Sequence, residues 1–87
     1  MNPIMLHFVN QKLNSITPQE LISLASEYQF PLTYAEAEKV VSILRRQKID
    51  ITNTVQRQQI IAAIAREVSQ EKANYIQYLI QSYLDRN

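Results

Sequence analysis

The 87-residue sequence contains no cysteine, no glycine and no tryptophan, and only three prolines. Without cysteine it has no disulfide and no thiolate for catalysis, zinc or an iron–sulfur cluster, which fits a reducing compartment. Without glycine it lacks the glycine-dependent loops that bind phosphates and dinucleotides in many enzymes. These absences exclude thiol chemistry and the common nucleotide-binding motifs.

Long hydrophobic runs and an excess of one charge are also missing. Beyond the N-terminal stretch, the longest apolar run is the six residues Ile60–Ala65, whereas a membrane-spanning helix needs about 20. The apolar stretch Pro3–Val9 is short and has no basic region before it, so we expect no signal peptide. Nine basic and eight acidic residues give a net charge of +1. We expect a soluble, cytoplasmic protein with no membrane partner.

Helix start signals divide the chain into five segments. Thr17–Glu20 and Thr33–Glu36 are capping boxes, in which a threonine caps the helix and a glutamate three residues later binds back to it. Asn53 and Ser69 mark two further starts, and Pro3 suits a first helical position. The predicted helices cover residues 3–14, 18–29, 34–47, 54–68 and 70–85.

The predicted fold is all-α, a compact orthogonal bundle of about five short helices in a single domain over residues 1–87. Ile49-Asp50-Ile51 is the one alternating segment, and we expect it to be an extended connector whose isoleucines point inward. Ile60–Ala65 is apolar on all sides of its helix, which is typical of a helix surrounded by others. We therefore expect the helix at 54–68 to be central.

The sequence offers little for catalysis. His7 is the only histidine, lies on the predicted polar face of the first helix, and has no second ligand at a metal-binding spacing. A catalytic His7 would need a concave pocket around it, which the sequence gives no reason to expect. We expect no enzymatic activity, no cofactor, no metal site and no small-molecule ligand.

The charges are unevenly distributed along the chain. Residues 17–38 hold four acids and no base, whereas residues 39–66 hold six bases and one acid. Four of these bases form a candidate nucleic-acid patch on the helix at 34–47 and just after it: Lys39, Arg45, Arg46 and Lys48. The same cations would also complement the C-terminal dipole of that helix, and the acidic helix at 18–29 could neutralise them.

The helices carry more apolar surface than one small core needs. The residues for which we expect exposure are Ile4 and Phe8 in the first helix and Tyr75 and Tyr78 in the last. Contiguous exposed apolar area marks interaction surfaces, and tyrosine is common in interfaces. The alternative is that these side chains belong to the core. We treat the four as a candidate protein interface.

Several segments resemble a known family. They are Asn14–Leu21, Tyr28–Thr33, Ala37–Lys39 and Ile49–Ile51, and together they span roughly residues 10–70. The sequence is similar to a family of short, uncharacterised helical proteins, a domain of unknown function, found in bacilli and their relatives. The resemblance implies a bacterial cytosolic setting and carries over no functional residue.

The sequence favours a small non-enzymatic protein–protein interaction module that forms a homodimer through its first and last helices. The alternative is a weak nucleic-acid-binding domain that uses the basic patch on the helix at 34–47. The sequence leaves open whether the partner is a second copy or another protein.

Overall fold

Five α-helices make up most of the computed structural model, which describes residues 3–85 apart from the side chains of Met5 and Tyr83. In chain order they are α1 (Pro3–Ser15), α2 (Pro18–Glu27), α3 (Tyr34–Leu44), α4 (Thr54–Glu67) and α5 (Gln70–Leu84). Residues 3–85 contain no β-strand. The all-α prediction is confirmed, and each helix begins at the predicted residue.

The helix starts follow from short-range hydrogen bonds. At α2 the Thr17 hydroxyl accepts the Glu20 N–H at 3.2 Å, and the Glu20 carboxylate accepts the Thr17 N–H at 3.2 Å. At α3 the corresponding distances between Thr33 and Glu36 are 3.1 and 2.9 Å. Each capping box pairs two N–H groups that the helix itself leaves without partners. Local sequence therefore fixes where these helices begin.

The end of α2 differs from the prediction by two residues. Gln29 takes a left-handed conformation with φ 61°, and it is the only residue of 3–85 with positive φ. The Phe30 N–H donates to the Ala25 carbonyl at 2.9 Å, and the Gln29 N–H donates to the Ser26 carbonyl at 2.9 Å. This is a Schellman ending, which usually places glycine where Gln29 stands. In a chain without glycine, a glutamine reverses the backbone and stops the helix.

The connector between α3 and α4 holds α1 in place. The Asn14 side chain accepts the Ile49 N–H at 2.7 Å and donates to the Ile49 carbonyl at 3.1 Å. One turn earlier, the Asn10 side chain accepts the Ile51 N–H at 2.7 Å. Ile49 and Ile51 are 4% and 0% exposed, as predicted for inward-pointing residues. α3 ends three residues before the predicted end, because the chain turns at Arg45 and Arg46 before it enters this connector.

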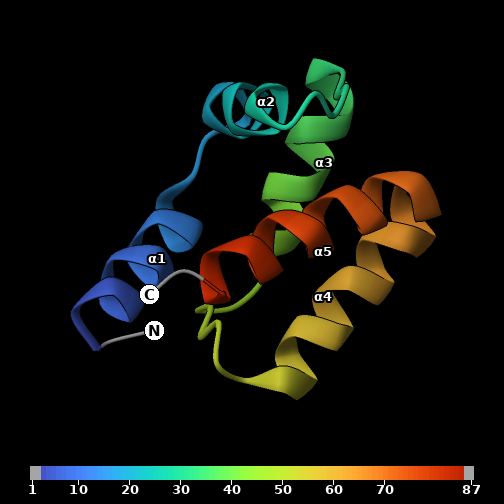
Figure 1. Ribbon diagram of the computed structural model, residues 1–87. Coiled ribbons are helices and arrows are strands. Elements are labelled where there is room, and N and C mark those ends of the chain that lie inside the picture. The colour runs from blue at the N-terminus through green and yellow to red at the C-terminus, as the bar shows by residue number, and fades with distance from the viewer. Residues whose placement is uncertain (1–2, 86–87) are drawn as a thin grey trace.

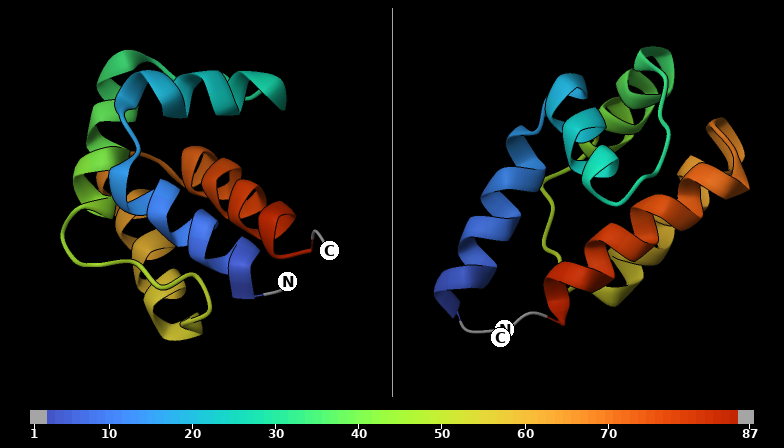
Figure 2. Two further views of the ribbon diagram at one scale, coloured as in Figure 1. Left: turned by 90° about the vertical axis from the view of Figure 1, so that its left-hand side faces the viewer. Right: turned by 45° about the horizontal axis from the view of Figure 1, so that its top comes forward.

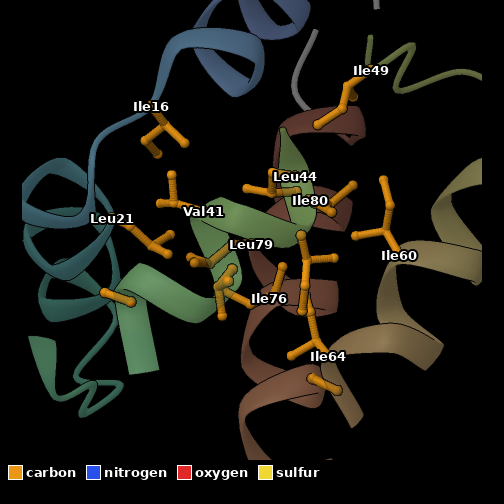
Figure 3. Packing of buried hydrophobic residues seen from close by; sticks show 14 of the residues in the cluster. Ile16, Leu21, Val41, Leu44, Ile49, Ile60, Ile64, Ile76, Leu79 and Ile80 are labelled. Carbon is orange, nitrogen blue, oxygen red and sulfur yellow. The ribbon is translucent and has the colours of Figure 1, made fainter. Parts of the chain in front are cut away.

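α3 contributes more buried residues to the core than α4, the helix predicted to be central. In Figure 3, Val41 and Leu44 of α3 lie between Leu21 of α2 and the isoleucines of α4 and α5. The buried residues of α3 are Ala37, Val40, Val41, Ile43 and Leu44. Those of α4 are only Ile60, Ala63 and Ile64. The apolar run in α4 therefore has one face buried in the core and another face that is only partly buried.

The helices cross one another, with one exception. Figure 1 shows α4 and α5 as an antiparallel hairpin, with α1 on the opposite side of the molecule from α4. In the first view of Figure 2, α2 crosses α3 at a steep angle, as expected of an orthogonal arrangement. Within residues 3–85, no helix has the length and apolar character needed to cross a membrane.

Candidate interaction surfaces

Two large apolar side chains of α1 face solvent. Ile4 is 70% exposed and Phe8, one turn later, is 58% exposed. Residues four apart lie on the same face of a helix, so the two side chains are neighbours. The opposite face of α1 packs on the core through Val9 and Leu13. We call Ile4 and Phe8 the α1 stripe.

The predicted interface residues of α5 lie in a different setting. The Tyr75 ring stacks on Phe30, with ring centroids 4.5 Å apart and planes 4° apart. Tyr78 meets Phe30 and Tyr28 edge-on, at 5.6 and 5.7 Å between centroids. Tyr75 is half-buried, whereas Tyr78 is 56% exposed. These rings form an intramolecular aromatic cluster that ties α5 to the end of α2.

Polar contacts hold the outer end of the aromatic cluster. The Tyr75 hydroxyl donates to the Glu71 carboxylate at 2.7 Å, and this bond raises the pKa of Tyr75 and lowers that of Glu71. The Lys72 ammonium lies 5.1 Å from the Tyr75 ring centroid and donates to the Pro31 carbonyl at 2.8 Å. Both the ring and the hydroxyl of Tyr75 therefore have partners within the chain. No local pattern in the sequence indicates the bond from Lys72 to Pro31, because the two residues lie 41 apart.

The basic residues of the candidate nucleic-acid patch are all exposed: Lys39, Arg45, Arg46 and Lys48. Arg46 forms a two-bond ion pair with Glu67 of α4 at 2.7 and 2.5 Å. The guanidinium lowers the pKa of the Glu67 carboxyl. Arg45 donates to the Ile16 carbonyl at 3.1 Å. The acid that neutralises part of this patch therefore comes from α4, whereas Glu20 of the acidic α2 pairs with Lys12 of α1.

A surface groove of about 730 Å³ lies beside His7, where nothing in the sequence indicated a concave site. Asp50 also lines this groove. Its carboxylate accepts the Thr52 N–H at 3.0 Å and the Thr52 hydroxyl at 2.6 Å, and both bonds lower its pKa. The described residues contain no group of His, Asp and Glu side chains that could hold a metal ion. Asp50, the acid that shares this groove with His7, is thus held in a turn by its bonds to Thr52.

A second groove, of about 370 Å³, runs along the α4–α5 hairpin. The α4 side is lined by Thr54, Arg57, Gln58, Ile61, Ala62 and Ala65. The α5 side is lined by Gln70, Gln77, Ile80 and Gln81. We call this the α4–α5 groove. Its described lining residues combine an apolar floor with amide side chains and one cation, and none of them is an acid.

Comparison with known proteins places the chain in a family. A family model described as a protein of unknown function (DUF2624) matches residues 1–84. No curated protein and no solved structure matches the chain significantly. The match spans all five helices. It therefore includes the C-terminal helix as well as the segments at 10–70 that carry the resemblance.

Proposed function

Because the chain belongs to the DUF2624 family, whose function is unknown, we propose a role from its surface: a non-enzymatic interaction module that forms a homodimer through the α1 stripe. The observation that carries this proposal is the exposure of Ile4 and Phe8 at adjacent turns of one helix. Isolated exposed apolar side chains are common, whereas contiguous exposed apolar area marks interaction surfaces, and these two side chains are neighbours.

A second copy is a suitable occupant of the α1 stripe. The net charge of +1 places no strong repulsion between two copies. A two-fold axis would set two α1 helices side by side and bring the same residues of both copies together. A standard interface covers about 800 Å² on each partner, which is about 15% of the 5380 Å² surface of this chain. The 13-residue α1 is about 20 Å long and supplies such a surface together with its neighbours.

The aromatic cluster has a supporting part in this proposal. Tyr75 stabilises the fold through its stack on Phe30 and its bond to Glu71, so its substitution would disturb the monomer. Tyr78 has an exposed edge that could extend a contact from α5. The variants that test the dimer therefore belong on α1.

Substitution of Phe8 tests the proposed dimer. Phe8→Ser removes an exposed ring, so it should shift association to at least tenfold higher protein concentration with little effect on folding. Val55→Ser on α4 is the matched control, because Val55 is 62% exposed and lies outside the α1 stripe. Sedimentation velocity over a concentration series measures both variants. If Phe8→Ser associates like the unaltered chain, the α1 stripe is not the interface.

Weak nucleic-acid binding through the basic patch is the alternative function. It has less support, because the Arg46 charge is paired with Glu67 and Arg45 is bound to a main-chain carbonyl. Lys39 and Lys48 remain exposed, so they would carry the contacts to phosphate. This alternative requires binding that falls steeply with salt and is lost in the Lys39→Gln/Lys48→Gln variant. Absence of binding to a labelled duplex at low salt would remove it.

The proposed module belongs in a bacterial cytoplasm. A fold without cysteine gains nothing from an oxidising compartment. Tagging the chain and separating cytoplasm from membrane and secreted fractions tests this assignment.

A further inference from the structure

The apolar run of α4 has two faces with different surroundings. Ile60, Ala63 and Ile64 are buried in the core. Ile61, Ala62 and Ala65 point into the α4–α5 groove, where Ala62 is exposed and the other two are half-buried. Ile61 and Ala65 also pack against the edge of the core, but each keeps part of its surface open. This second face is an apolar floor at the edge of the core, between two helices whose polar side chains border it.

The groove has the shape of a site for a helix. Its α4 lining follows a helical repeat from Thr54 to Ala65, which is about 17 Å, or three turns, along the helix axis. The two alanines allow another backbone to approach closely, while the half-buried Ile61 gives apolar contact beside them. A third helix laid on an antiparallel helix pair buries its apolar face in this way.

Arg57 gives the groove its electrostatic preference. Among the described residues that line the groove, it is the one that carries a charge. Its Nη2 donates to the Thr54 hydroxyl at 3.2 Å, but its buried Nε has no hydrogen-bond partner among the described residues. An N–H group that is buried without an acceptor is costly, and a carboxylate is the strongest acceptor for a guanidinium. The Nε itself is out of reach of a ligand, but the guanidinium forms no ion pair among the described residues, so an acid brought to this end of the groove would pair with its charge.

We propose that the α4–α5 groove binds an acidic amphipathic helix of a partner protein, with a carboxylate on Arg57 and an apolar face on Ile61, Ala62 and Ala65. The glutamines along the rim supply both donors and acceptors for polar side chains on the flanks of that helix. This site is separate from the α1 stripe. The monomeric Phe8→Ser variant should therefore bind the helix as well as the unaltered chain does.

The probe is a phage library of random 16-residue peptides selected against the immobilised protein. We expect enriched peptides that carry Asp or Glu with apolar residues at helical spacing. Added to isotope-labelled protein, they should shift the amide NMR signals of Ile61, Ala62 and Gln77. No enrichment, enrichment of peptides without an acid, or shifts confined to other surfaces would overturn the proposal.

Two variants and a control test the assigned contacts. Arg57→Gln should weaken the enriched peptides about tenfold or more, because it removes a charge-assisted bond. Arg66→Gln is the control, because it makes the same charge change at an exposed position of α4 outside the groove. Ala62→Glu, at an exposed position, should block binding by placing a charge on the apolar floor. Equal affinity for Arg57→Gln and Arg66→Gln would contradict the role of Arg57.

The groove could instead be covered by a second copy of this chain. In that case the signals of Ile61 and Ala62 would shift with protein concentration in the absence of peptide, and this result would overturn the proposal. Circular dichroism of each variant establishes that it is folded, so that loss of binding reports on the groove itself.

Discussion

Replacing Asn14 with alanine removes the side chain that fixes α1 to the connector. The Asn14 amide binds both main-chain groups of Ile49, accepting the N–H at 2.7 Å and donating to the carbonyl at 3.1 Å. Ile49 is 4% exposed, so its N–H has little access to water. The substitution therefore leaves a buried donor without a partner and weakens the attachment of the helix that carries the α1 stripe.

The size of the effect follows from these contacts. A buried polar group left unpaired costs about 1–3 kcal/mol, and the lost bond to the Ile49 carbonyl adds about 0.5–1.5 kcal/mol. Alanine regains about 0.5 kcal/mol through its better helix propensity. We expect Asn14→Ala to lower the free energy of unfolding by about 1–4 kcal/mol. At about 0.05–0.15 kcal/mol per residue the whole domain has roughly 4–13 kcal/mol, so this is a large share.

Urea unfolding followed by circular dichroism at 222 nm measures the change in stability. Asn74→Ala is the matched control, because the Asn74 side chain only accepts a bond from Gln70 on the exposed side of α5. The control removes the same amide and gains the same helix propensity, so it should change stability by less than about 0.5 kcal/mol. Equal losses for the two variants, or a loss below about 1 kcal/mol for Asn14→Ala, would refute the reasoning.

Three further substitutions test local features of the fold. Gln29→Gly should raise the free energy of unfolding by up to about 1 kcal/mol, because glycine tolerates φ 61°; a lower urea midpoint would count against this. Thr33→Ala should cost about 1 kcal/mol through loss of the α3 cap, and an unchanged thermal midpoint would argue against it. Arg46 lowers the pKa of Glu67, so their pair stabilises the fold above the unfolded carboxyl pKa, and this contribution disappears as pH falls through the lower folded pKa. Arg46→Gln should flatten that acid dependence, and an unchanged slope in acid unfolding would exclude the pair as its source.

The helix starts are the part of the fold that the sequence predicts best. A capping box such as Thr17 with Glu20 lies within four residues, so its hydrogen bonds require no knowledge of distant segments. Helix ends are less local. The end of α2 depends on Gln29 in a left-handed conformation, and a glutamine gives no sign of this in the sequence. The attachment of Asn14 to Ile49 joins residues 35 apart, and no local pattern indicates it.

Hydrophobic periodicity shows which helix faces are apolar but not what covers them. For α4, the apolar run predicted a helix surrounded by others, whereas Ile61 and Ala62 line an open groove. For α5 it could not separate Tyr75, which stacks on Phe30, from the exposed Tyr78. Ile4 on α1 was expected at the surface, and it lies there. The inner face of α1 is set by Val9, which is buried, and by Asn10 and Asn14, which bind the connector. Contacts between helices decided each of these cases.

The central claim is that this chain pairs with a second copy through an apolar surface on α1. Light scattering behind a sizing column, over a range of protein concentrations at low and high salt, tests it most directly. The account predicts a species of twice the 10.2 kDa chain mass that persists in high salt, because apolar contacts are not screened. A mass of 10.2 kDa at every concentration, or a dimer that dissociates in high salt, would contradict it.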